Sequence, residues 1–299
     1  MIYSKPPLSI QDQINLLRAR GMVIGDEKYA GNYLKNISYY RLSAYCLPFQ
    51  IYNSKKDHEF KPGTTFENVL QLYLFDRELR LFVLDVVERL EISLRTQIIY
   101  QFSIEKEGWW FLNPGNYRDT DKYQRQIEKI KEELNRSNEV FIRHYKEKYS
   151  SPETPPAWMT FEVISMGLLS SIFKNLLNGK EKKEIARHFG LATPYILQNW
   201  MHSMTVVRNI CAHHGRLWNR VQTISLVFPQ KTTDLWLSSN EINANKFFAF
   251  FSCYLYLLKR INPKTTKVKQ FKALLSKYPN IDVSAMGFPE NWMDEKLWH

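Results

Sequence analysis

Cysteine is scarce in this chain, and no apolar run is long enough for a membrane. The 299 residues contain three scattered cysteines, Cys46, Cys211 and Cys253, which do not suggest a disulfide framework. The most apolar run, residues 247–258, is too short to span a bilayer. The opening residues, MIYSKPPLSIQDQ, lack the apolar segment of a secretion signal. We therefore predict a reducing, cytoplasmic location and no membrane partner.

Several catalytic signatures are also missing. The sequence has no glycine-rich phosphate loop, no G-x-S-x-G motif and no carboxylate cluster typical of two-metal nucleases. Cys211, His213 and His214 are close together, but C-x-H-H is not a usual zinc spacing and no second half-site is evident. We expect no metal and no cofactor, and zinc is the alternative for these three residues.

The charge is strongly of one sign. Lys and Arg number 41 against 30 Asp and Glu, which gives a formal net charge of +11. A positive field favours polyanions, of which nucleic acid is the commonest large one. The basic residues recur with Tyr and Trp, and this favours nucleic acid over the alternative of general solubility. The apolar fraction of 44% indicates a folded protein.

Helical periodicity dominates the sequence and predicts an all-α fold. A turn-rich stretch, 53–65, interrupts it and holds at most a short hairpin. The predicted helices cover 9–21, 26–49 as one or two helices, about 65–102, 121–136, 139–149, 160–177, 181–190, a helix from Thr193 that ends at Gly215, about 241–261, and one further helix in the tail.

The longest predicted helix, about 65–102, begins with Thr64 and Glu67 as a capping box. Its predicted apolar stripe is Leu79, Phe82, Val83, Val86, Val87, Leu90, Leu94 and Ile98. Its charged side chains have two open interpretations, a solvated face or a role around an active site. These residues are Arg77, Arg80, Glu88, Glu91 and Arg95.

Residues 204–220, MTVVRNICAHHGRLWNR, place an arginine, an asparagine and two histidines on the last turns of an apolar helix. On a helix Asn209 and His213 are i,i+4 neighbours, whereas Arg208 and His213 diverge by about 140°. One regular helix cannot easily aim both at the same phosphate. Either the helix unwinds at its end, or a second copy of the chain supplies the missing group around a two-fold axis.

These residue types suit RNA cleavage. A base takes the proton of the 2′-hydroxyl, the freed oxygen attacks phosphorus, and an acid protonates the leaving 5′-oxygen. Histidine serves in either role near neutral pH, and arginine stabilises the developing charge. Such a site needs no metal and spares DNA. R-x4-H alone is a weak signal, however, and His213 with His214 could instead be a helix C-cap pair favoured by the dipole.

Longer motifs add a resemblance to a known family. The segment RNICAHHGRLWNR resembles the signature of the Abi-like (AbiD/AbiF-type) abortive-infection proteins of the HEPN superfamily. Residues 20–49, 60–96, 155–173 and 199–220 fit the same family in order, and the similarity covers about 1–260. The superfamily hallmark is R-x4–6-H with a polar residue after the arginine. Here it is Arg208, Asn209 and His213, with no departure.

This resemblance implies a HEPN-type helical bundle, 63–262, with an N-terminal helical segment, 1–62, that contacts RNA. A tail with one helix, 263–299, has no counterpart. The resemblance further implies homodimerisation through the motif helices and metal-independent endoribonuclease activity. The protein would act as an abortive-infection toxin in anti-phage defence. Arg208, Asn209 and His213 would be catalytic, and a small noncoding antitoxin RNA is an expected partner besides the RNA substrate.

Further residues are predicted to bind RNA. They are His214, Arg216, Trp218, Asn219, Arg220, Tyr39, Tyr40, Arg41, Arg77 and Arg80. For Tyr39, Tyr40 and Arg41 the alternative interpretation is half-buried packing. The alternative function is a non-catalytic RNA-binding module held in a complex with a small noncoding RNA. There Arg208, Arg216 and Arg220 grip phosphate and His213 is structural. A third class is a HEPN scaffold paired with another enzyme, such as a nucleotidyltransferase.

Overall fold

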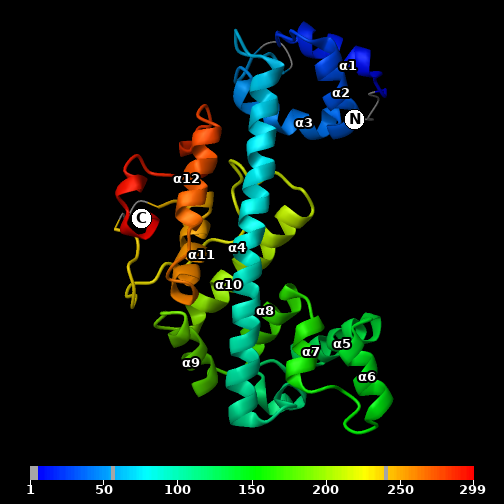
Figure 1. Ribbon diagram of the computed structural model, residues 1–299, viewed down its shortest axis with the longest axis vertical. Coiled ribbons are helices and arrows are strands. Elements are labelled where there is room, and N and C mark those ends of the chain that lie inside the picture. Colours follow the sequence, from blue (N-terminus) through cyan, green and yellow to red (C-terminus); the bar gives the residue numbers. More distant parts are fainter. Residues whose placement is uncertain (1–5, 55–57, 239–241) are drawn as a thin grey trace. The chain divides into compact units, whose positions relative to one another are not determined.

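The computed structural model describes residues 6–54, 58–238 and 242–299. These residues form α-helices, short 3₁₀ turns and isolated β-bridges but no β-strand, so the predicted all-α class is confirmed. The α-helices are α1 (Ile10–Ala19), α2 (Glu27–Ile37), α3 (Tyr39–Cys46), α4 (Phe66–Lys106), α5 (Thr120–Arg136), α6 (Val140–Lys148), α7 (Ala157–Val163), α8 (Met166–Asn175), α9 (Lys180–His188), α10 (Pro194–Ala212), α11 (Phe247–Ile261) and α12 (Lys267–Lys277) (Figure 1).

The chain divides into two compact units. The first unit is Met1–Leu79 with Leu274–Ile281, and the second is Arg80–Ala273 with Asp282–His299. Helices α4 and α12 therefore contribute residues to both units. The domain boundaries proposed from the sequence, near residues 62 and 262, stay a prediction.

The first unit is built on capped short helices. Ser9 caps α1 and Asp26 caps α2, because each side chain accepts a backbone N–H of the first turn. The segment 26–49 forms two helices, since Ser38, with φ of 69°, separates α2 from α3. The buried hydroxyl of Tyr45 donates to a carboxylate oxygen of Asp76 across 2.6 Å and ties α3 to the first part of α4.

The turn before α4 differs from prediction in one detail. Thr65 and Asn68 form the capping pair: the Thr65 hydroxyl accepts from the Asn68 amide at 3.1 Å, and the Asn68 side chain accepts from the Thr65 amide at 2.9 Å. The Thr64 hydroxyl instead donates to the Lys61 carbonyl. The predicted hairpin falls partly on residues 55–57, outside the described residues, and beside them Gln50 and Phe60 form one antiparallel bridge.

The apolar stripe predicted for α4 is confirmed. All of its members are buried except Phe82, which is half-buried.

The charged residues of α4 differ from one another in their burial. Arg89 pairs with Asp85 at 3.2 Å on an exposed face, whereas Arg95 is buried and pairs with Glu91 at 2.8 Å. A solvated face is therefore the wrong interpretation for Arg95.

The predicted helix over 160–177 is wrong, because the chain breaks at Ile164 and forms α7 and α8. Arg95 donates to the carbonyl oxygens of Phe161 and Ile164, which α7 leaves unpaired at its end. Ser165 then caps α8, and Glu133 of α5 accepts from the amide of Ser165 at 2.6 Å. Distant helices thus stabilise a break that local apolar periodicity does not reveal.

Helix α10 packs against α8, α9 and α11 in the second unit (Figure 1). Helix α11 begins at Phe247, later than predicted, and is buried through Leu258. The end of the chain packs on α11: the Trp298 indole donates to the Ser252 hydroxyl at 3.0 Å and stacks on Phe248.

Across the described residues, none of the helices combines the length and apolarity required to cross a membrane.

Candidate functional site

Helix α10 ends in a Schellman turn that contains both histidines of the motif. His213 is the C-cap, and His214 has a left-handed conformation with φ of 57°. The Gly215 amide donates to the Ile210 carbonyl at 2.8 Å, and the His214 amide donates to the Cys211 carbonyl at 3.1 Å. The helix therefore ends at Ala212, before the predicted Gly215. The turn leaves the side chain of His213 exposed.

The three residues of the predicted catalytic set are all exposed. A guanidinium nitrogen of Arg208 lies 3.4 Å from the side-chain oxygen of Asn209. Arg208 and His213 remain five residues apart on an almost regular helix, which separates them by about 140° around the axis and about 7.5 Å along it. A single copy thus does not direct both side chains to one point.

Arg208 lines a pocket of about 570 Å³ between α4, α7 and α10. Most of its charged neighbours are carboxylates, and neither Asn209 nor His213 is among the described residues that line it. The lining residues are Leu84, Asp85, Glu88, Glu91, Ile92, Arg95, Glu162 and Arg208. The carboxylates attract the Arg208 guanidinium and repel phosphate from the pocket interior. A phosphate would therefore meet Arg208 at the pocket rim.

Asp85 illustrates the electrostatics of this pocket. Burial raises the pKa of its carboxyl, but hydrogen bonds from Lys267 and Arg89 outweigh burial, so the pKa lies below its ordinary value. Asp85 is therefore ionised at neutral pH.

The sequence does not indicate Glu162 as part of this pocket, because the α7–α8 break is not predicted. For Glu88 and Glu91 the sequence leaves open whether they form a solvated face or contribute to a site.

The residues after α10 divide into buried and exposed groups. Trp218 is 3% exposed, so an RNA base has almost no access to its ring. The half-buried Asn219 accepts a hydrogen bond from Lys246 at 2.6 Å, and Lys246 also donates to the Ala285 carbonyl at 3.1 Å. Lys246, which the sequence did not single out, thus fixes Asn219. Arg220 and His214 are exposed, and Arg216 is half-buried.

The other predicted RNA contacts lie near the N-terminal end. Tyr39 is half-buried, and its hydroxyl accepts from Arg20 at 2.6 Å. Tyr40 is 88% exposed, and Arg41 and Arg77 are exposed. Arg80 is only 4% exposed, so its guanidinium offers little surface to RNA.

Two observations bear on metals. Among the described residues, no group of three or more His, Cys, Asp or Glu side chains is arranged to hold a metal ion. Cys211 is buried, while His213 and His214 are exposed. The zinc alternative for these three residues therefore has no support from their arrangement.

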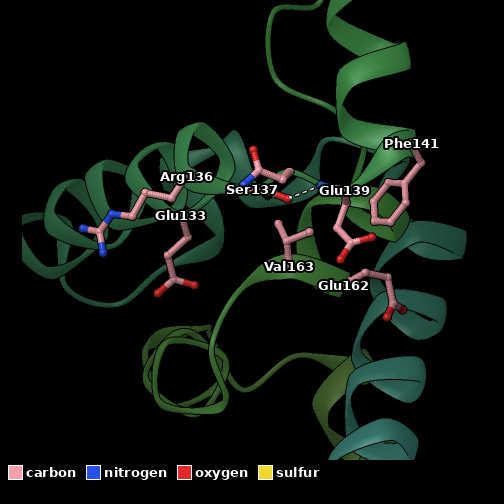
Figure 2. Close-up of a pocket in the computed structure, with 8 residues that line it drawn as sticks. Glu133, Arg136, Ser137, Glu139, Phe141, Glu162 and Val163 are labelled. Carbon is pink, nitrogen blue, oxygen red and sulfur yellow. Dashed lines mark hydrogen bonds between the residues drawn. The ribbon is translucent and has the colours of Figure 1, made fainter.

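A second acidic pocket, of about 630 Å³, adjoins α5, α6 and α7 (Figure 2). The carboxylates of Glu133, Glu139 and Glu162 line it, and Figure 2 shows Arg136 extending away from Glu162. Glu162 lines both this pocket and the pocket of Arg208. Both hollows therefore carry a charge that disfavours phosphate.

Comparison with known proteins identifies the chain at family level. No curated protein and no solved structure matches it. The model of one family, described as Abi-like protein, matches residues 32–219. That span is more than half of the chain and includes Arg208, Asn209 and His213. The chain therefore belongs to the Abi-like protein family.

Proposed function

We propose that this protein is a metal-independent endoribonuclease of the HEPN type that acts as an abortive-infection toxin. Membership of the Abi-like family suggests an abortive-infection function. The observation that carries the ribonuclease proposal is the exposure of Arg208, Asn209 and His213 together on the last turns of α10. Exposed side chains with these functional groups can reach a phosphodiester without rearrangement of the core.

In this proposal the reaction is an internal transesterification. The ribose 2′-oxygen loses its proton to a base and bonds to phosphorus, while the bond to the 5′-oxygen breaks and that oxygen takes a proton from an acid. His213 serves as the base or the acid. Arg208 binds the phosphate oxygens as charge develops. Asn209, on the same helical face as His213, holds the imidazole or contacts the phosphate.

The proposed site is completed by a second copy of the chain. Arg208 and His213 of one copy diverge, and the Arg208 pocket is acidic. A two-fold axis near the end of α10 brings Arg208 of one copy towards His213 of the other. A homodimer with two arginines and two histidines around one groove follows from this arrangement.

We retain as RNA contacts the exposed His214, Arg220, Tyr40, Arg41 and Arg77 and the half-buried Arg216. The buried Trp218 and Arg80 are assigned to packing. A small noncoding RNA that restrains the toxin, and a cytoplasmic location, remain parts of the proposal.

The test is cleavage of RNA by purified protein in EDTA. We expect cleavage by the wild type and none by His213→Ala, with an unchanged thermal melting curve. His202→Ala is the matched control, because His202 is an exposed histidine on the same helix. Cleavage by His213→Ala at the wild-type rate would contradict the assignment of His213.

The alternative is a non-catalytic RNA-binding module held with a small noncoding RNA. It is favoured by the separation of Arg208 from His213 within one copy. It predicts salt-dependent RNA binding without cleavage, weakened about equally when Arg208, Arg216 or Arg220 is replaced. The EDTA assay separates the two functions directly.

A further inference from the structure

A basic groove runs between α5 and α8 in the second unit, and it shares only Glu133 and Arg136 with the second acidic pocket. Its volume is about 520 Å³. Its lining residues are Lys122, Arg125, Gln126, Lys129, Glu132, Glu133, Arg136, Ser165, Gly167, Leu168 and Ser171. The sequence predicts 121–136 only as a helix, so the groove has no assigned role.

The basic residues of the groove share one face of α5. Lys122, Arg125, Lys129 and Arg136 follow one another at intervals of three, four and seven residues, which a helix places on one side over about 21 Å. In the described part of the chain, Arg125 and Lys129 make no hydrogen bond or ion pair, and both are exposed. Their charges are therefore available to a ligand.

The two carboxylates of the groove are already engaged. Glu133 accepts hydrogen bonds from the amide and hydroxyl of Ser165 at 2.6 and 3.0 Å. Glu132 pairs with Arg136 at 3.4 Å. Lys122 pairs with Asp119 at 3.4 Å. The cations of the groove that remain for a ligand are therefore Arg125 and Lys129.

The floor of the groove is a bonded polar network. Gln126, only 4% exposed, donates to the hydroxyl oxygen of Ser171 at 2.8 Å and accepts from the side-chain amide of Asn175 at 3.1 Å. The Ser171 hydroxyl can accept this bond and still donate its own hydrogen. Ser171 is exposed and therefore offers that hydrogen to a ligand oxygen in the groove.

The composition of the groove indicates its occupant. Protein interfaces rely on central aromatic or apolar anchors, but among the described residues that line this groove the only aliphatic side chain is that of the buried Leu168. Spaced cations with hydroxyl donors instead suit the phosphates of a nucleic-acid backbone. Such contacts fix a strand in place without reading its sequence.

We propose that the α5–α8 groove binds the phosphate backbone of an RNA strand, with Arg125 and Lys129 as its main contacts. The proposal deepens the ribonuclease function and rests on it for the identity of the ligand. It places a substrate-holding surface on residues outside the α10 motif. Loss of the groove should therefore weaken RNA binding and raise KM, while it leaves the chemical step at His213 unchanged.

The test uses full-length protein carrying His213→Ala, so that bound RNA is not cleaved. The groove variant adds Arg125→Glu and Lys129→Glu. The control adds Lys131→Glu and Lys183→Glu, two exposed lysines outside the groove, and changes the net charge equally. Binding of a labelled single-stranded oligoribonucleotide is followed by fluorescence anisotropy over a salt series, and circular dichroism compares the folding of all variants.

We expect the control to bind as the parent does and the groove variant to bind at least about tenfold weaker. The slope of log K against log salt should fall in magnitude by about 1.4, because each lost phosphate contact contributes about 0.7. Equal binding by groove variant and control overturns the proposal. A second result also overturns it: the groove variant binds polyglutamate more weakly than the control does, while both bind RNA equally. The partner of the groove would then be an acidic protein.

The outcomes also separate this inference from the proposed function. RNA binding that depends on the groove, together with no cleavage by the wild type, supports the groove and rejects the ribonuclease. Cleavage that depends on His213, together with equal RNA binding by groove variant and control, supports the ribonuclease and rejects the groove. A parent protein that binds no RNA, together with no cleavage by the wild type, overturns both.

Discussion

Arg95 of α4 donates a hydrogen bond to the carbonyl oxygen of Ile164 across 2.9 Å. The same guanidinium contacts the Phe161 carbonyl and pairs with Glu91 at 2.8 Å. One buried cation therefore stabilises the end of α7 and helps to form the pocket that Arg208 lines. The geometry around the proposed site depends on a residue that does not itself carry out the chemistry.

Replacing Arg95 should be costly. In Arg95→Met the end of α7 loses its donor and the partly buried Glu91 loses its partner, so we expect the free energy of unfolding to fall by about 2–4 kcal/mol. Arg89→Met removes an exposed pair on the same helix and should cost less than about 1 kcal/mol. Urea denaturation measures both, and equal losses would contradict the role given to Arg95.

The conformation of His214 gives a second prediction. Its positive φ costs a side chain with a branched β-carbon roughly 1–2 kcal/mol, whereas asparagine tolerates this conformation. We therefore expect His214→Val to be less stable than His214→Asn by about that amount. Both variants lose the imidazole, so the comparison isolates the backbone. If thermal unfolding found the valine variant equal or more stable, the Schellman turn would not be as described.

Lys182 should make stability depend on alkaline pH. Burial, with a smaller effect from Arg118, lowers the pKa of its amine to about 7. The unfolded chain keeps this amine protonated up to about pH 10.4, so the unfolded state binds more protons between about pH 7 and 10. The free energy of unfolding should then rise with pH in this window.

Comparison with Lys182→Met isolates this effect from other titrating groups. The difference in free energy of unfolding, wild type minus variant, should increase from pH 7 to pH 10 in a urea denaturation series. A difference that stays constant or decreases over this window would show that burial does not lower the pKa of the Lys182 amine.

Long periodic elements could be predicted from the sequence, because their signals are local. The stripe from Leu79 to Ile98 specifies α4 without reference to the rest of the fold. The break at Ile164 could not be predicted in this way, since its stabilising groups are Arg95 and Glu133 on other helices. The α4 cap was placed one residue early because Thr64 bonds to the Lys61 carbonyl instead.

The candidate site could also be predicted only in those features that depend on local sequence. The spacing of Arg208, Asn209 and His213 predicted their common helix and the divergence of the outer two. It did not predict the acidic neighbours of Arg208, because Glu162 is brought there by tertiary packing. Nor did it reveal that Trp218 is buried or that Lys246 binds Asn219.

A shared site between two copies predicts complementation. Arg208→Ala and His213→Ala should each be inactive alone. Mixed after dissociation and reassociation, they form heterodimers in which the intact Arg208 of one copy faces the intact His213 of the other. We expect up to about a quarter of wild-type cleavage activity, since half of the dimers would be mixed and each would hold one of its two Arg208–His213 pairs intact. No recovery despite heterodimer formation would place both residues of a site in one copy.

The central claim is that the substrate supplies its own attacking oxygen to a site containing His213. The most direct measurement uses two RNA strands of one sequence, one of which has a single 2′-deoxyribose at a cleaved position. With the protein in EDTA, we predict that cleavage at that bond disappears, and that the all-ribose strand yields a 2′,3′-cyclic phosphate and a 5′-hydroxyl. Continued cleavage at the deoxy position, or a product ending in a 3′-hydroxyl, would contradict the account.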